Sequence, residues 1–333
     1  MNQTPTHPPP VLITDCDHSD TDAEAAVLEA AGLGWRLGQY ASAAELIRGG
    51  AGARVLINQY TPITAAVLDA LPQVQLVVRY GVGVDSVDVA AATERGVWVA
   101  NVPDYGTAEV ADHTIALTMA LLRGISVLSR GTAAGEWDYQ KAVPLRRLSE
   151  LTFGVIGCGA IGRAVAARAA ALGMRVIGTD VDQSRGAEAP DQLTLVALDE
   201  LLAEADVISL HATLNETSRH LIGADTLARM KPGGYVINTA RGGLIDTAAL
   251  LAALDEGRLA GAGLDVLETE PPSELGWRLA AHPAAVVTPH AAWYSEESFR
   301  ALKTSVAEEA VRVLTGAAPR CPVNRPERLR GVA

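Results

Sequence analysis

Arg241, Glu270 and His290 follow predicted strands, where their side chains could do chemistry together. Arg241 ends an apolar stretch and precedes two glycines, so a ligand can approach the backbone beside a permanent positive charge. A guanidinium in such a loop can bind a carboxylate through two hydrogen bonds. If Glu270 and His290 meet in the fold, the carboxylate fixes the imidazole tautomer and favours an acid–base role near neutral pH. Each residue alone fits an ordinary surface polar group equally well.

A second constellation lies in residues 153–180, where an apolar run, a glycine turn, an alanine-rich helix and another strand end in Asp180. Gly157, Gly159 and Gly162 have G-x-G-x-x-G spacing, which allows a tight turn, close approach of a pyrophosphate and helix packing on the strand. Free amides at the helix start bind the anion, and Asp180 stands where a carboxylate meets the adenosine ribose. A glycine-rich turn without a ligand is the alternative.

A third candidate is the loop in residues 76–88, where a strand ends in Arg79 and opens into Gly81, Val82 and Gly83. The amides of this loop could form a concave nest for a small anion, with Arg79 adding charge. From the residues alone, a turn whose glycines serve only to adopt positive φ is the better interpretation.

Alternating apolar runs and helical patterns must position these residues. In the first part we expect strands at 11–14, 55–58, 76–79 and 97–101 and helices at 23–31, 63–70 and 87–95. A helix at 108–123, with Thr107 as N-cap, has apolar residues on more than one face, which predicts burial against another element or subunit. Residues 135–151 suggest an irregular link.

Beyond residue 180 we expect helices at 198–203, 225–230 and 247–256 and strands at 207–210, 235–238, 261–265 and 286–288. With the strands of the glycine unit, this makes about six strands of a doubly wound parallel sheet. Ligands of such sheets bind outside the carboxyl ends of the strands, where the candidate polar residues stand.

The remaining histidines lack spacing that predicts a metal site, and we expect none. His211 ends a strand near the glycine turn, where a structural role is expected. Trp293, three residues after His290, could form an apolar wall over a substrate or could serve domain packing.

The composition indicates a globular chain of two domains, with 333 residues of which 49% are hydrophobic. A net charge of -12 argues against partners that are nucleic acids or anionic membranes. Three widely spaced cysteines support neither a disulfide framework nor a cysteine-rich zinc site, so we expect a reducing, cytoplasmic location. Residues 1–10 resemble a loose tail rather than a signal peptide, and the run at 115–122 is far shorter than the roughly 20 residues that span a bilayer.

Five segments, RYGVGVD, GVIGCGAIG, NTARGGLID, LDVLETEPP and TPHAAW, cover nearly the whole chain in this order and resemble the D-isomer-specific 2-hydroxyacid dehydrogenases. HATLNE at 211–216 and HAAWYSE at 290–296 look most like the C-terminal binding protein branch of that family. Thr213 stands where most relatives have proline, which points to the same branch.

The resemblance implies that Arg241 binds and polarises the substrate, that His290 exchanges a proton with its C2 oxygen, and that Glu270 orients His290. It implies hydride transfer between C2 and a nicotinamide. It also reverses the interpretation of the glycine loop, since the family holds the substrate carboxylate on the amides of Gly81 to Gly83. In the C-terminal binding protein branch Arg79 would assist. The implied cofactor contacts are Val110, Gly157, Gly159, Ala160, Ile161, Gly162, Asp180, Ala212, Thr213, Asn215, Thr239, Ala240 and Asp265.

The family architecture implies two Rossmann-like or flavodoxin-like α/β domains with doubly wound parallel sheets. An NAD-binding Rossmann domain at 105–293 would be inserted in a discontinuous substrate domain at 1–104 and 294–333. The cofactor expected is NAD, because Asp180 repels a 2′-phosphate and no arginine directly follows it, although Arg185 is near. A homodimer formed through the cofactor domain is also implied, and the helix at 108–123 suits that contact.

Our main hypothesis is an NAD-dependent dehydrogenase of a small D-2-hydroxy acid, with an apolar or thioether side chain suggested by Trp293. One rival is an NAD(H)-sensing scaffold of the C-terminal binding protein type, in which catalysis is incidental. Another is a phosphoglycerate dehydrogenase. Against it, we expect no room for an appended regulatory domain and no basic cluster dedicated to a phosphate, although Arg146 and Arg147 are uncommitted.

Overall fold

The computed structural model describes residues 8–182 and 193–330, and the chain divides into two compact units. Unit 1 comprises Met1–Tyr105 with Ser295–Ala333, and unit 2 comprises Gly106–Tyr294. The predicted domain limits are each one residue earlier, and the assignment of a ligand to each domain stays a prediction. Residues 1–7 of the predicted tail and Arg185 lie outside the described residues.

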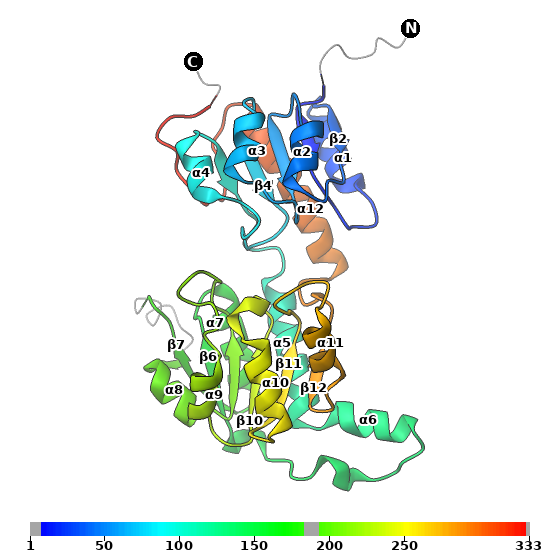
Figure 1. The fold of residues 1–333 in the computed structure, drawn as a ribbon, viewed down its shortest axis with the longest axis vertical. Coiled ribbons are helices and arrows are strands. Elements are labelled where there is room, and N and C mark those ends of the chain that lie inside the picture. The colour runs from blue at the N-terminus through cyan, green and yellow to red at the C-terminus, as the bar shows by residue number, and fades with distance from the viewer. Residues whose placement is uncertain (1–7, 183–192, 331–333) are drawn as a thin grey trace. The chain divides into compact units, whose positions relative to one another are not determined.

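Unit 1 contains a five-stranded parallel sheet in the order β2-β1-β3-β4-β5 (Figure 1). Its strands are β1 Val11–Ile13, β2 Trp35–Leu37, β3 Val55–Asn58, β4 Leu76–Arg79 and β5 Trp98–Ala100. Helices α1 Asp22–Ala30 and α12 Glu296–Leu314 pack together on one face, and α2 Ala43–Gly49, α3 Ala65–Ala70 and α4 Val89–Glu94 cover the other. Because both faces are covered, the central strands are continuous apolar runs.

Unit 2 contains a seven-stranded parallel sheet in the order β12-β11-β10-β9-β6-β7-β8. Its strands are β6 Thr152–Ile156, β7 Arg175–Thr179, β8 Leu193–Leu195, β9 Val207–Leu210, β10 Gly234–Asn238, β11 Leu259–Leu264 and β12 Ala285–Val287. Its helices are α5 Thr107–Leu122, α6 Ile125–Ala133, α7 Ala160–Ala171, α8 Leu198–Glu204, α9 Ala224–Arg229, α10 Thr247–Asp255 and α11 Glu274–Ala281, with short 3-10 helices at Tyr139–Ala142, Leu148–Glu150 and Gly242–Leu244.

The strand orders confirm the predicted fold class. In unit 2 the chain runs outward from β6 through β7 to β8. It then returns to the other side of β6 and runs outward again from β9 through β10 and β11 to β12. The crevice at this reversal, outside the carboxyl ends of β6 and β9, is where doubly wound sheets bind dinucleotides. Unit 1 has the flavodoxin-like order, in which the second strand lies outside the first.

Helix α5 packs against other elements of its own unit, which is one of the two alternatives that its apolar pattern predicted. It packs on α7 and on β10 and β11, and its buried residues include Val110, Thr114 and Leu117. The N-cap prediction was wrong. Thr107 is the first helical residue, and Gly106 occupies the cap position without a side-chain hydrogen bond.

Among the α-helices and strands of the described residues, the sequence patterns missed β2, α2, α6, β8 and α11. The two strands are only three residues long and each lies at a sheet edge, where partial exposure weakens the apolar pattern. With β8 included, the second sheet has seven strands rather than about six. The link predicted to be irregular at 135–151 contains the 3-10 helices Tyr139–Ala142 and Leu148–Glu150. Before it, α6 begins directly after Gly124, which adopts φ 61°.

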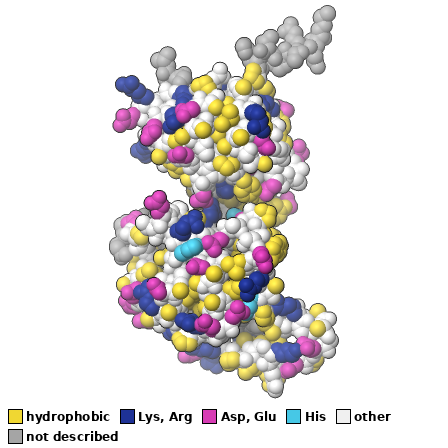
Figure 2. Space-filling model, viewed as in Figure 1, with side chains coloured by type: hydrophobic (Ala, Val, Ile, Leu, Met, Phe, Trp, Pro, Cys, Tyr) yellow, Lys and Arg dark blue, Asp and Glu magenta, His cyan; other side chains and the backbone are white. Residues whose placement is uncertain are grey.

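No single helix in residues 8–182 and 193–330 is long and apolar enough to cross a membrane. Helices α5 and α6 meet that criterion only as a pair, with a bend of 65° between them. On the face that Figure 2 shows, acidic and basic side chains are interspersed with hydrophobic ones in both units.

Candidate active site

His290 and Glu270 meet, although 20 residues separate them in the chain. His290 Nδ1 lies 2.7 Å from Glu270 Oε2, and the other carboxylate oxygen accepts a hydrogen bond of 3.0 Å from the Leu267 amide. Burial alone would raise the pKa of Glu270. The hydrogen bond and charge of His290, the Leu267 amide and the charge of Arg241 outweigh that effect, so the pKa of Glu270 is lowered. The pair therefore joins a carboxylate to an imidazole whose Nε2 is the nitrogen left for a reacting group.

Arg241 lies on a tightly packed turn after β10. Its backbone oxygen accepts a 2.9 Å hydrogen bond from the Asn238 amide group, and its Nη1 donates to the Ala240 oxygen at 2.7 Å. A Cβ on Gly242 would lie 1.9 Å from the carbonyl carbon of Leu267, so only glycine lets this turn pack against the segment that leads to Glu270. The turn thereby holds Arg241 where its charge acts on the Glu270 carboxylate.

A second histidine–glutamate pair also connects the Arg241 turn with the segment that leads to Glu270. It was not predicted from the sequence. His220 Nε2 lies 2.6 Å from Glu268 Oε1, while Glu268 Oε2 accepts from the Thr247 amide at 3.0 Å. The His220 amide donates to the Gly243 oxygen at 2.9 Å, next to the Arg241 turn. The pKa of Glu268 is lowered, because hydrogen bonds from Thr247 and His220 outweigh the opposing effect of burial. In the sequence, only the position of Glu268, two residues before Glu270, indicated that this pair could lie near the site.

The glycine turn between β6 and α7 has the geometry that a dinucleotide requires. Gly157 adopts φ 94°, and a Cβ there would lie 2.6 Å from the Ala212 nitrogen. A Cβ on Gly162 would lie 2.0 Å from the Gly157 oxygen, so the helix can approach the strand only through glycine. Gly159 is the N-cap of α7, with Ala160 and Ile161 in its first turn. The open amides and the space left by these glycines fit a pyrophosphate.

Asp180 follows β7 and closes this turn. Its Oδ2 accepts a 2.7 Å hydrogen bond from the Cys158 amide, and its Oδ1 accepts one of 2.9 Å from the Asp182 amide. The carboxylate is therefore held beside the glycine turn, as recognition of a ribose requires.

Other predicted cofactor residues already have partners inside unit 2. Thr239 Oγ1 lies 2.8 Å from Thr114 Oγ1 in the interior, and the Asn215 side-chain oxygen accepts from the Thr217 and Ser218 amides. Val110 on α5 is 9% exposed. Any contact of Thr239 with a cofactor would therefore come mainly from its backbone. Ala212 and Thr213 lie in the loop after β9.

His211 behaves as the structural residue that was expected. Its Nε2 lies 2.8 Å from Ser209 Oγ, and burial of the ring lowers the pKa of His211 to about 3. The imidazole is thus uncharged at neutral pH and unsuited to proton donation there. Trp293 is partly exposed, with its ring 5.6 Å from that of Tyr294 in an edge-to-face arrangement.

In unit 1 the loop after β4 is arranged as an anion nest would be. Gly81 adopts φ 126°, and a Cβ there would lie 2.0 Å from Arg79 Nη1, so the glycine leaves room for the guanidinium. The carbonyl oxygens of Gly81 and Val82 accept hydrogen bonds from the Val102 amide and from Asn101 Nδ2, at 3.0 and 2.6 Å. With those carbonyls engaged, the amides of the loop, Gly83 included, are the groups that remain for a ligand.

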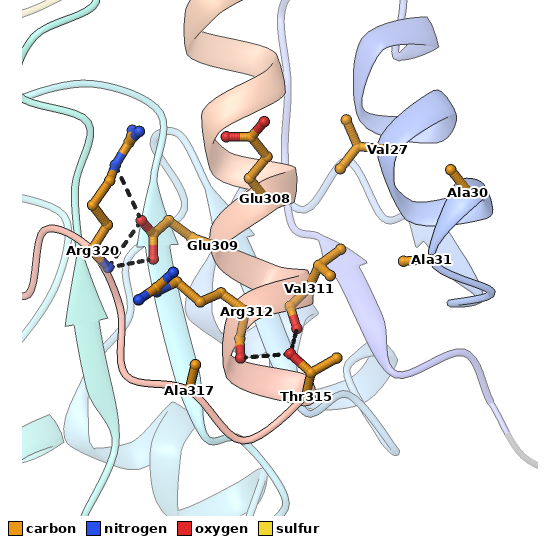
Figure 3. Close-up of a pocket in the computed structure, with 10 residues that line it drawn as sticks. All are labelled: Val27, Ala30, Ala31, Glu308, Glu309, Val311, Arg312, Thr315, Ala317 and Arg320. Carbon is orange, nitrogen blue, oxygen red and sulfur yellow. Dashed lines mark hydrogen bonds and ion pairs between the residues drawn. The ribbon is translucent and has the colours of Figure 1, made fainter.

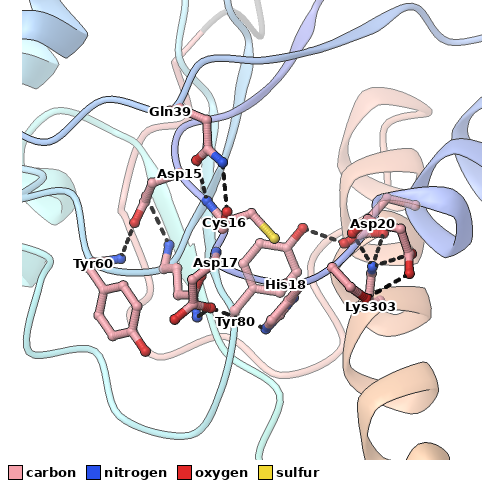
Figure 4. Close-up of polar contacts among 12 residues, drawn as sticks. Asp15, Cys16, Asp17, His18, Asp20, Gln39, Tyr60, Tyr80 and Lys303 are labelled. Atoms are coloured by element: carbon pink, nitrogen blue, oxygen red, sulfur yellow. Dashed lines mark hydrogen bonds and ion pairs between the residues drawn. The ribbon is translucent and has the colours of Figure 1, made fainter.

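Tyr80, directly before this loop, is anchored by a buried polar cluster (Figure 4). Its hydroxyl donates a 2.5 Å hydrogen bond to Glu24 Oε1, and the other Glu24 oxygen lies 3.5 Å from Lys303 Nζ. Lys303 is fully buried and also donates to Asp20 Oδ1 at 2.8 Å. Helix α12 and the segment after β1 are thereby tied to the start of the loop.

A cavity in unit 1 lies apart from these residues. It has about 610 Å³ and lies between α1 and the end of α12, and its lining includes Val27, Ala30, Val311, Arg312 and Arg320 (Figure 3). Arg320 is engaged there by Glu309. A second cavity, of about 510 Å³, lies beside α5 and α6 in unit 2. None of the predicted site residues lines either cavity.

A family model described as D-isomer specific 2-hydroxyacid dehydrogenase, NAD binding domain, matches residues 115–292. The chain belongs to the D-isomer specific 2-hydroxyacid dehydrogenase family. A glycerate dehydrogenase of Methylorubrum extorquens is 37% identical to this dehydrogenase over 271 residues, which are 80% of this chain and 84% of the relative.

Two further comparisons extend this result. A D-3-phosphoglycerate dehydrogenase of Methanocaldococcus jannaschii is 38% identical over 278 residues, 82% of this chain, but the chain spans only 52% of that relative. A D-lactate dehydrogenase of Aquifex aeolicus, solved with NAD and lactic acid, superimposes with a TM-score of 0.83 at 28% identity and covers 92% of this chain and 96% of its own. This dehydrogenase is thus an NAD-dependent enzyme that acts on CH–OH donors.

Proposed function

We propose that the enzyme interconverts a small D-2-hydroxy acid and its 2-oxo acid, with Arg241, Glu270 and His290 as the catalytic residues. The observation that carries this assignment is the 2.7 Å contact between His290 Nδ1 and Glu270 Oε2. The charge of Arg241 also acts on this carboxylate and lowers the pKa of Glu270.

Each of the three residues has a distinct task. Arg241 pairs with the substrate carboxylate and polarises the adjoining carbonyl, which a planar guanidinium can do through parallel hydrogen bonds. His290 gives a proton from Nε2 to the C2 oxygen during reduction and takes it back during oxidation. Glu270 holds the ring by Nδ1 and stabilises its charged form. NAD, when bound, exchanges the hydride with C2.

The residues proposed to hold NAD are those of the glycine turn, Gly157 to Gly162, with Asp180 at the adenosine ribose. Thr239 and Ala240, the segment from Ala212 to Asn215, Val110 and Asp265 complete the proposed contacts. The negative charge of Asp180 favours NAD over NADP, because a 2′-phosphate would be repelled.

In unit 1 we assign Arg79 and the amides of Gly81, Val82 and Gly83 to the substrate carboxylate. Trp293 of unit 2 is assigned to the substrate side chain, which favours an apolar or thioether group.

Phosphoglycerate is the second candidate substrate, supported by the 38% identity with a phosphoglycerate dehydrogenase. Arg146, one of the two arginines left without a role by the sequence, does not favour it. Arg146 Nη1 donates to Asp206 Oδ1 at 2.8 Å, and Asp206 also accepts from the Thr152 amide, where β6 begins. Arg146 is thus held at the amino ends of the strands, away from the carboxyl ends where ligands bind.

A panel of 2-oxo acids with NADH tests the substrate assignment. Members should include pyruvate, 2-oxoisocaproate, 4-methylthio-2-oxobutanoate, glyoxylate, hydroxypyruvate and 3-phosphohydroxypyruvate, with Arg241→Ala as the control. We expect the highest kcat/KM on an apolar or thioether acid. Equal or higher kcat/KM on 3-phosphohydroxypyruvate would favour phosphoglycerate, and no turnover above Arg241→Ala on any acid would contradict the enzymatic assignment.

We also propose a homodimer, formed through the segment of α6 and the 3-10 helix Tyr139–Ala142 rather than through α5. This segment exposes large hydrophobic side chains, with Trp137 at 93% and Ile125 at 55%. Self-association would cover such side chains. In light scattering we expect Trp137→Glu to be monomeric, while Trp277→Glu, which replaces an exposed tryptophan of α11, remains dimeric. A dimeric Trp137→Glu protein would contradict this interface.

The resemblance of residues 211–216 and 290–296 to the C-terminal binding protein branch stays a prediction. The contact between His290 and Glu270 favours catalysis over an NAD(H)-sensing scaffold. A partner protein retained only in the presence of NADH, with no 2-oxo acid reduced, would support the scaffold instead.

A further inference from the structure

A chain of hydrogen bonds that reaches the proposed NAD contact Asp265 lies behind the His290 turn, and its other two members have no role in the proposed function. His113 on α5 places Nε2 2.9 Å from Thr288 Oγ1, and Thr288 Oγ1 lies 2.5 Å from Asp265 Oδ1. Asp265 is 1% exposed. The three residues come from α5 and from the ends of β11 and β12, all within unit 2.

The chemistry of the groups fixes the direction of this chain. The carboxylate of Asp265 can only accept, so Thr288 donates its single hydroxyl proton to Asp265. The hydroxyl oxygen must then accept from His113, which requires that His113 carry a proton on Nε2. His113 is thus a donor to Thr288 in both its neutral and its charged form.

Asp265 also accepts hydrogen bonds from the backbone that follows His290. Its Oδ1 accepts from the Ala291 amide at 2.9 Å and its Oδ2 from the Ala292 amide at 2.8 Å. The backbone oxygen of Asp265 accepts from the His290 amide at 2.8 Å. Residues before and after His290 are therefore tied to one buried aspartate.

This bracing matters because His290 has an unfavourable backbone conformation. Its φ of 54° lies in the left-handed region, which non-glycine residues adopt rarely and only when their surroundings hold them there. The hydrogen bonds from Thr288, Ala291 and Ala292 to Asp265 supply such surroundings.

We propose that His113 and Thr288 are positioning residues for His290. His113 orients the Thr288 hydroxyl, Thr288 and the two amides fix Asp265, and Asp265 holds the left-handed turn that aims the His290 ring at Glu270. This inference rests on the proposed catalytic role of His290. Its structural part concerns the ring geometry and can be measured without substrate.

The test compares Thr288→Val, which keeps the shape but removes the hydroxyl, with Thr288→Ser, which restores it. Thr118→Val is the matched control, because Thr118 is also buried and its hydroxyl donates only to the Thr114 oxygen one turn back on α5. The readouts are kcat and KM on the best 2-oxo acid, NADH affinity by fluorescence, and the ¹⁵N shifts of the His290 ring, which report its hydrogen bond to Glu270 without substrate.

We expect Thr288→Val to lower kcat at saturating NADH about tenfold or more, as loss of one buried hydrogen bond allows. The His290 ¹⁵N shifts should change with it, while Thr288→Ser and Thr118→Val should resemble the wild type. Wild-type kcat and ring shifts in Thr288→Val, or a loss that serine does not restore, would overturn the proposal. If Thr288→Val does not fold, the test uses His113. His113→Phe must then lower kcat and change the ring shifts, whereas His113→Gln, whose amide can donate to Thr288, must leave both as in the wild type. Any other result overturns the proposal.

A wild-type enzyme that reduces no 2-oxo acid would count against the proposed function alone. The ring shifts of His290 in Thr288→Val would still decide the positioning role.

Discussion

Asp180 is the residue whose single charge is expected to decide between the two nicotinamide cofactors. Its carboxylate is held beside the glycine turn by the Cys158 and Asp182 amides. Asp180→Ala removes the charge that repels a 2′-phosphate, so the ratio of kcat/KM with NADH to that with NADPH should fall by about tenfold or more. Asp225→Ala, which removes an exposed aspartate from the first turn of α9, is the control. An unchanged ratio in Asp180→Ala would remove Asp180 from the ribose site.

Single residues were predictable where their chemistry follows from a local motif. The apolar runs place Arg241, Glu270 and His290 at strand ends, and the resemblance to a known family suggested their roles. The partners of Asp265 were not predictable, because His113 and Thr288 are 175 residues apart in sequence and the segment that contains Thr288 gives no sign of His113. The His220–Glu268 pair was missed for the same reason.

At the scale of elements, the approach of α7 to β6 depends on one glycine. A methyl group on Gly162 would lie 2.0 Å from the Gly157 oxygen, so Gly162→Ala must push the helix away from the turn. We expect NADH affinity to fall about tenfold or more. In the control, Gly131→Ala on α6, the nearest atom to the added methyl is at the flexible end of Glu136, 3.1 Å away. Equal NADH affinity in fluorescence titrations of both variants would contradict this account of the turn.

Buried central strands such as β3 and β4 could be predicted to the residue, because continuous apolar runs stand out from their surroundings. Peripheral elements could not. The three-residue strands β2 and β8 lack a repeating pattern. The N-terminus of α5 was predicted one residue too late, because threonine is a good capping residue, whereas the cap position is occupied by Gly106.

At the scale of the whole molecule, each unit contains a histidine whose pKa burial lowers, His18 in unit 1 and His211 in unit 2. The unfolded chain binds a proton at each near pH 6.5, whereas folded His211 does so only near pH 3. The resulting stability is fully present above pH 6.5 and is lost progressively as the pH falls toward 3. We expect the unfolding free energy from urea titrations to fall between pH 7.5 and pH 5, and to fall less steeply in His211→Gln. Equal slopes would contradict a folded state in which His211 stays neutral.

The central claim is that a dinucleotide fold presents His290, held by Glu270, as the group that exchanges the substrate proton. It is tested most directly by the rate of NADH oxidation with the best 2-oxo acid in wild type and His290→Ala. His282→Ala, which replaces another histidine of unit 2, serves as the control. We predict that His290→Ala lowers kcat roughly 100-fold or more with NADH affinity intact, and that His282→Ala retains the wild-type rate. A wild-type rate in His290→Ala, or a loss explained by failure to bind NADH, would contradict the claim.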